Sequence, residues 1–119
     1  MNKHKRSILI LVAVIVASLS TSGVAEAHFL SARTAKKGAK LVARDYAENF
    51  AGQGDEDVAY GVGKCSQRTA HKWVCKFYVQ GIDVDGGYIC RGFAIVRYVS
   101  ASSNQVTARS QSQRLACVR

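Results

Sequence analysis

The sequence predicts an α+β domain in which one helix packs on a four-stranded antiparallel β-meander closed by two disulfides. Three observations predict this fold. Apolar residues first recur at helical spacing and later at a period of two. Short polar connections separate the period-two segments, which favours antiparallel hairpins. An even number of cysteines lies in the second half of the chain, namely Cys65, Cys75, Cys90 and Cys117.

Residues 1–27 have the three parts of a secretory signal peptide. A basic start (NKHKR) precedes the ten apolar residues 8–17, and residues 25–27 (AEA) match an A-x-A cleavage site. A membrane-spanning helix needs about 20 apolar residues. We therefore expect cleavage after Ala27, no transmembrane segment afterwards, and one domain over residues 28–119 that is secreted or associated with the cell envelope.

The expected mature domain is small and basic. Cleavage removes 27 of the 119 residues and leaves 92. Three of the 17 Lys and Arg residues and one of the eight Asp and Glu residues lie in the leader, so the domain keeps 14 and seven, a formal charge of +7. A core of this size is marginal, which makes disulfides valuable. The charge favours anionic polymers, anionic membrane surfaces or cell-wall polymers as partners without selecting among them, and an alkaline pI with no dedicated partner stays open. An extracellular protein is the other expected partner.

The helix is predicted over residues 31–50. Ser31 is a favourable N-cap, and Gly52 and Gly54 favour termination. Gly38 is expected to weaken this helix by about 1 kcal/mol relative to alanine. Seven residues at helical spacing form the apolar stripe: Ala35, Ala39, Val42, Ala43, Tyr46, Ala47 and Phe50.

Four strands are predicted, over residues 58–65, 72–80, 87–99 and 105–118. The turn-rich connections are 66–71, 81–86 and 100–104.

The hairpins predict which cysteines pair. Opposed residues in a hairpin have a constant sum of residue numbers, and Cys65 and Cys75 share a midpoint in the first connection. Cys90 and Cys117 share one in the third connection. We therefore expect the disulfides Cys65–Cys75 and Cys90–Cys117. Zinc sites use closer cysteine spacings, so we expect no metal and no cofactor.

The strand over residues 87–99 carries the main candidate surface. Both of its faces are partly apolar, so packing of the other face on the helix leaves Phe93 and Ile95 exposed between Arg91 and Arg97. An apolar patch edged with cations is typical of a protein-binding surface. The expected contacts are Arg68, His71, Lys72, Arg91, Phe93 and Arg97.

Residues 91–98 (RGFAIVRY) also resemble the RNP1 segment of RNA-recognition motifs. That motif needs a strand before its first helix and a second helix after RNP1, and neither is predicted. We therefore do not expect a nucleic-acid partner.

Three stretches around the cysteines carry a wider resemblance: residues 62–65 (VGKC), 71–75 (HKWVC) and 90–92 (CRG), followed by Cys117. In this cysteine order the chain resembles small exported proteins of high-GC Gram-positive bacteria, which implies export and the helix-then-sheet layout but no activity. The layout is also similar to that of cystatins. Their inhibitory Q-x-V-x-G loop is not matched by residues 80–83 (QGID).

The sequence predicts a non-enzymatic exported binding protein. His71 lies in a basic segment with no pattern that suggests an orienting acid or a nucleophile. Three alternatives stay open: a secreted hydrolase inhibitor, a small secreted enzyme that acts on polyanions through His71, and a structural or envelope-associated protein with no soluble ligand.

Overall fold

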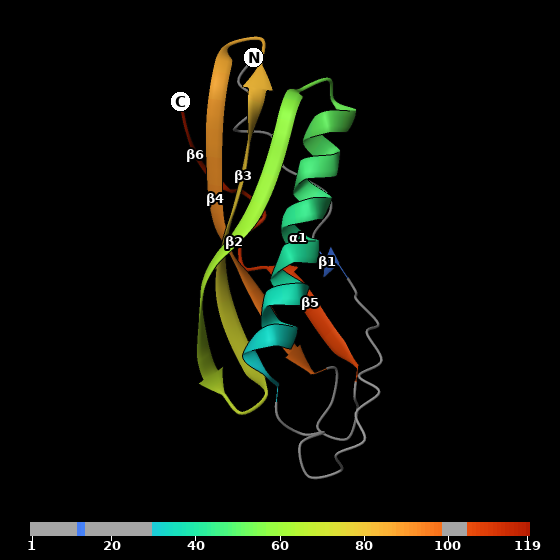
Figure 1. Cartoon of the computed structure of the whole chain (residues 1–119), viewed down its shortest axis with the longest axis vertical. Coiled ribbons are helices and arrows are strands. Elements are labelled where there is room, and N and C mark those ends of the chain that lie inside the picture. The colour runs from blue at the N-terminus through green and yellow to red at the C-terminus, as the bar shows by residue number, and fades with distance from the viewer. Residues whose placement is uncertain (1–11, 14–29, 99–104) are drawn as a thin grey trace.

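The computed structural model of the chain describes residues 12–13, 30–98 and 105–119. One helix, α1 (Ala32–Gly52), lies along one face of an antiparallel sheet (Figure 1). The strands are β1 (Val12–Ala13), β2 (Glu56–Thr69), β3 (Lys72–Asp83), β4 (Gly86–Tyr98), β5 (Val106–Ser110) and β6 (Ala116–Val118). Their order is β1-β5-β4-β3-β2, and β6 pairs with β4 beyond the end of β5. The predicted helix on an antiparallel meander is confirmed.

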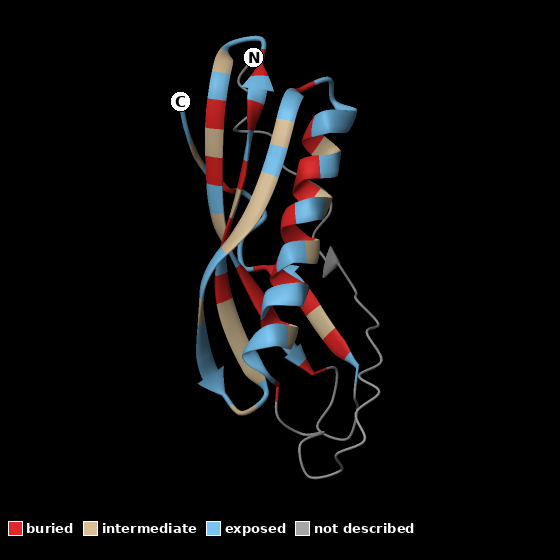
Figure 2. Ribbon diagram, viewed as in Figure 1, coloured by how far each residue is buried: buried red, intermediate tan, exposed pale blue. Residues whose placement is uncertain are grey.

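Helix α1 begins and ends close to the predicted residues. The Ser31 Oγ accepts a 3.1 Å hydrogen bond from the Thr34 N–H, as expected of an N-cap. After Gln53, Gly54 adopts a positive φ of 98°, which favours glycine. The seven residues of the predicted apolar stripe are all buried against the sheet (Figure 2). Helical spacing therefore identified the packed face of the helix.

Gly38 has a packing role that the sequence did not reveal. It is buried, and a Cβ placed there would lie 2.9 Å from Val96 Cγ1 and 3.3 Å from Ala108 Cβ. The missing side chain lets α1 approach β4 and β5 closely. The expectation that Gly38 only weakens the helix was therefore incomplete.

We expect Gly38→Ala to lower the free energy of unfolding by about 1 kcal/mol, because overpacking against buried Val96 outweighs the gain in helix propensity. Urea denaturation measures the difference. The control is Gly52→Ala, since a Cβ at Gly52 would have no neighbour within 4 Å. That control is expected to be neutral or slightly stabilising. A Gly38→Ala variant more stable than the wild type would contradict the packing role.

The first two hairpins are longer than predicted. Strand β2 reaches Thr69, which pairs with Lys72 and leaves a turn of Ala70 and His71. Strands β3 and β4 likewise pair up to Asp83↔Gly86. Most of the predicted connections 66–71 and 81–86 are therefore strand, which corrects the sequence-based boundaries. Polar residues form the backbone hydrogen bonds of a strand as well as apolar residues do. Side-chain polarity alone therefore placed the ends of these strands too early.

The fourth predicted strand is broken in two. Extending the β4–β5 register from Ala94↔Ser110 would place Arg114 opposite Cys90, but Cys117 lies there. Three extra residues are thus accommodated between β5 and β6. The Tyr46 hydroxyl of α1 donates to the carbonyls of Ser112 and Gln113, at 3.3 and 3.4 Å, and holds this interruption in place.

Both disulfides pair as predicted, Cys65 with Cys75 and Cys90 with Cys117. Each joins residues directly opposed on neighbouring strands. The predicted connection 100–104 lies outside the described residues.

Strand β1 lies within the predicted leader, where Val12 and Ala13 pair with Arg109 and Ala108 of β5. Export and cleavage after Ala27 stay predictions. Within the described part of the chain, no helix is long and apolar enough to cross a membrane.

A polar network closes the end of the molecule where α1 ends and β4 begins. The Tyr88 hydroxyl donates to Asp55 Oδ2 at 2.6 Å, and Tyr88 and Asp55 are both buried. The Arg119 guanidinium binds both carboxylate oxygens of Asp83 at 2.9 Å. Asp83 is thereby paired with a cation, and Asp55 accepts a hydrogen bond from a neutral phenol inside the fold.

This network makes the free energy of unfolding decrease at high pH. Burial, and then the hydrogen bond to Asp55, raise the pKa of Tyr88 above its ordinary value of 10.0. Folding therefore favours the neutral phenol, and this contribution is complete below pH 10 and lost as the pH rises above it. We expect the unfolding free energy to fall more steeply above about pH 10 in the wild type than in Tyr88→Phe. Urea titrations at several pH values measure both slopes, and equal slopes would contradict the assignment.

Candidate binding surface

The face of the sheet turned away from α1, here called the outer face, carries the candidate contacts. Tyr88, Cys90, Ala94, Val96 and Tyr98 of β4 are buried on the side of α1. Because side chains alternate along a strand, the residues between them lie on the outer face. Four register pairs of β3 and β4 follow one another there: Tyr78↔Arg91, Lys76↔Phe93, Val74↔Ile95 and Lys72↔Arg97. Ile95 is buried, because strands flank it on both sides with Val74 and Arg109 opposite it, so the prediction that it is exposed was wrong.

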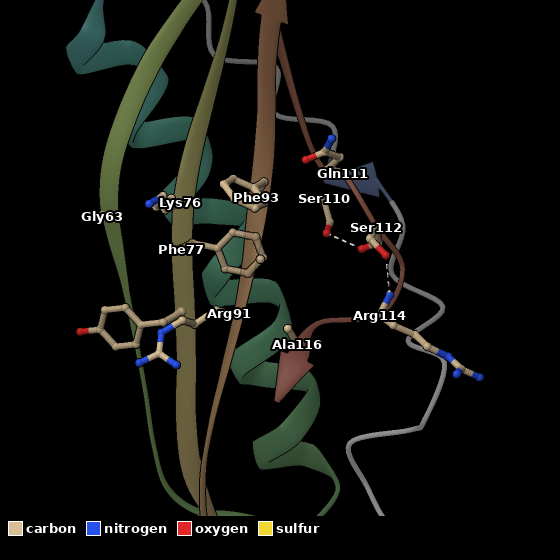
Figure 3. A pocket seen from close by; sticks show the side chains of 12 residues that line it. Gly63, Lys76, Phe77, Arg91, Phe93, Ser110, Gln111, Ser112, Arg114 and Ala116 are labelled. Atoms are coloured by element: carbon tan, nitrogen blue, oxygen red, sulfur yellow. Dashed lines mark hydrogen bonds between the residues drawn. The ribbon is translucent and has the colours of Figure 1, made fainter. Parts of the chain in front are cut away.

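A cavity of about 600 Å³ opens on the outer face (Figure 3). The strand next to β4 is interrupted here, since β5 ends at Ser110 and β6 begins at Ala116. The lining consists mostly of apolar surface. It comes from β3 and β4, from one residue each of β2, β5 and β6, and from the interruption: Gly63, Lys76, Phe77, Tyr78, Arg91, Gly92, Phe93, Ser110, Gln111, Ser112, Arg114 and Ala116.

Local packing fixes the inner wall of this cavity. The Phe77 ring is 2% exposed and stacks on the Tyr46 ring with centroids 5.7 Å apart. A Cβ at Gly92 would lie 2.7 Å from Leu115 Cδ2 and 3.1 Å from Phe77 Cζ. The wall is therefore formed by close-packed side chains that leave no room for a larger residue at Gly92.

The rim of the cavity is cationic. Lys76, Arg91 and Arg114 are exposed, and none of the described lining residues is acidic. Phe93, at 44% exposure, presents an aromatic side chain between these charges. The arrangement can receive an apolar group and hold an anion beside it.

The structure places four of the six predicted contacts on the outer face and two at its end. Arg91 and Phe93 line the cavity. Lys72 and Arg97 pair further along the same strands. Arg68 lies near the end of β2, at the register shift between Gln67 and Thr69. His71 lies in the hairpin turn, where its ring centroid is 5.9 Å from that of Tyr98.

Ten of the twelve lining residues were missed by the sequence analysis, among them Lys76, Tyr78 and Arg114. A signal existed for the first two, because a two-residue turn after Asp83 sets Lys76 opposite Phe93 and Tyr78 opposite Arg91. The position of Arg114 depends on the interruption after β5, which no sequence pattern marked.

The described residues contain no group of three or more His, Cys, Asp or Glu side chains placed to hold a metal ion. The His71 ring meets an aromatic ring, and its backbone N–H donates to Thr69 Oγ1 at 3.1 Å. Neither contact is of the kind that orients a general base.

No protein-family model matches the chain, and no curated protein or solved structure is significantly similar to it. The resemblance to exported proteins of high-GC Gram-positive bacteria therefore stays a prediction.

Proposed function

We propose that the protein is a non-enzymatic binding protein of the extracellular space or cell envelope, and that its outer face binds a protein with an acidic surface. The cavity beside Phe93 is the observation that carries the proposal. Its apolar lining accepts an aliphatic or aromatic side chain, while Lys76, Arg91 and Arg114 face the acidic groups around it.

A protein partner accounts for the cavity better than an anionic polymer does. A polymer of phosphates would satisfy the cations but would offer no apolar group to the ring of Phe93. A polymer of uronic acids could lay a sugar ring on Phe93 but has no side chain to fill the apolar cavity beside it. Exposed aromatic and arginine side chains together are the usual anchors of protein interfaces. Such a surface would associate quickly at low salt and more slowly as salt screens the charges.

The test is capture of partners from the culture fluid and envelope of the producing organism on immobilised oxidised protein. We expect the wild type to retain a protein that Phe93→Ala and Arg91→Gln do not retain. The matched control is Arg44→Gln, which removes one charge from the exposed side of α1. Capture of nothing above background, or equal capture by all four proteins, would contradict the proposal. Retention of a polysaccharide or polyphosphate alone would contradict the choice of a protein partner.

A further inference from the structure

A second groove lies between β2 and the first half of α1. Its volume is about 670 Å³. Residues 60–62 of β2 form one wall, and α1 forms the other with Ala32 and four cations: Arg33, Lys36, Lys37 and Lys40. This groove is separate from the outer-face cavity, and the two share no lining residue.

The strand wall of this groove is the edge of the sheet. Among the described residues, β2 pairs with β3 alone and stands last in the strand order. Alternate residues of an edge strand turn their N–H and C=O groups away from the sheet, where they can pair with another strand. At 14 residues β2 is long, and Tyr60, Gly61 and Val62 are only partly exposed beside the helix.

The helix wall supplies positive charges at an interval close to that of alternate side chains in an extended peptide. All four cations are exposed and none of the described lining residues is acidic. Residues three or four apart on a helix lie about 5–6 Å apart. Alternate side chains of an extended chain lie about 6.6 Å apart, since each residue advances about 3.3 Å. An extended segment with acidic residues at every second position would therefore place successive carboxylates near successive cations.

We propose that the groove between α1 and β2 binds an extended acidic peptide segment of a partner protein by adding it as a strand to the edge of β2. The strand edge gives the backbone hydrogen bonds, and the cations of α1 select the acidic side chains. A polyphosphate fits less well, because it accepts hydrogen bonds but leaves the carbonyl groups of the edge without donors. An acidic polysaccharide has hydroxyl donors, but they do not repeat at the backbone interval of a strand. This site stands independently of the outer-face function proposed above.

The probe is a capped octapeptide of alternating Glu and Thr, added to ¹⁵N-labelled oxidised protein and followed by amide chemical shifts. We expect the largest shifts at Tyr60–Val62 and along residues 33–40, and slower hydrogen exchange at β2 amides. Lys37→Gln combined with Lys40→Gln is expected to weaken binding about tenfold at low salt. Arg91→Gln combined with Arg97→Gln removes the same charge from the outer face and is expected to leave this affinity unchanged.

Two further ligands separate strand addition from simple charge attraction. The same octapeptide N-methylated at every residue keeps its charge but loses its donors, and we expect its affinity to fall at least tenfold. Polyphosphate of equal charge is expected to leave the Tyr60–Val62 amides unshifted. Equal binding of the N-methylated peptide, or shifts confined to the outer face, would overturn the proposal. If partner capture by the outer face fails while the β2 shifts persist, the proposed function fails and this site stands.

Discussion

Replacing Cys90 and Cys117 together by alanine is expected to lower the free energy of unfolding by about 3.5 kcal/mol on the chain-entropy model. The two residues are 27 positions apart, and their bridge closes the largest covalent loop among the described disulfides. Strand β6 has only three residues, so little else fixes it to β4. The bridge also positions Arg119, whose guanidinium binds Asp83. A loss of this size is a large fraction of the total stability of a small domain.

Urea denaturation of the wild type and the variant measures this loss. The matched control is the Cys65→Ala, Cys75→Ala double variant, whose bridge spans ten positions. The same model gives it a smaller loss, about 3 kcal/mol. Hydrogen exchange separates the two variants, because only loss of Cys90–Cys117 should expose the amides of residues 116–118. A loss below about 1 kcal/mol for the longer loop would contradict the account given by that model.

The disulfide pairing was predicted by an argument that holds only locally. A constant register was assumed along each hairpin, yet register shifts occur between Gln67 and Thr69 and again between Ser110 and Ala116. The first shift is one residue: the register at Thr69↔Lys72 would set Ser66 opposite Cys75, and the shift brings Cys65 there instead. The second is three residues, and it is this shift that brings Cys117 opposite Cys90. The prediction succeeded because the centre of each hairpin register lies near the midpoint of its cysteine pair. The register shifts that set the cysteines opposite each other could not be predicted from the sequence.

Helix burial was predictable because it depends on local spacing alone. The apolar stripe of α1 follows from the helical period, whatever the helix packs against. The role of Gly38 was not predictable, because it depends on Val96 and Ala108, which are distant in the sequence. Close approach of a helix and a strand depends on the residues of both elements, so it cannot be predicted from the sequence of one of them.

The candidate surface, too, was predictable only in part. Strand alternation was enough to place Arg91 and Phe93 on one face and to predict that Phe93 is exposed. It also predicted that Ile95 is exposed, which was wrong, because burial on that face depends on the neighbouring strands. The cavity beside them was not predictable, because it exists only where β5 stops short of β6. That interruption is held by the Tyr46 hydroxyl and by the buried Leu115 side chain. Side-chain positions on a strand are thus readable from sequence, whereas the space between strands depends on tertiary contacts.

Two phenylalanines that line the same cavity are expected to differ strongly in how much their replacement by alanine lowers the free energy of unfolding. Phe77 is 2% exposed and stacks on Tyr46, so Phe77→Ala should lower the free energy of unfolding by about 3–5 kcal/mol. Phe93 is 44% exposed, so Phe93→Ala should change it by less than about 0.5 kcal/mol. Urea denaturation gives both values.

Binding is expected to separate the two residues in the other direction. Phe93→Ala should abolish partner capture while the fold stays intact, because the exposed ring is the group a partner would meet. Phe77→Leu keeps an apolar side chain behind the cavity, and its folded fraction should still capture the partner. If Phe93→Ala proves as destabilising as Phe77→Ala, the ring at position 93 is part of the core and does not form a contact surface. If Phe93→Ala is stable and still captures the partner, binding lies elsewhere, and the cations of the rim act without the cavity.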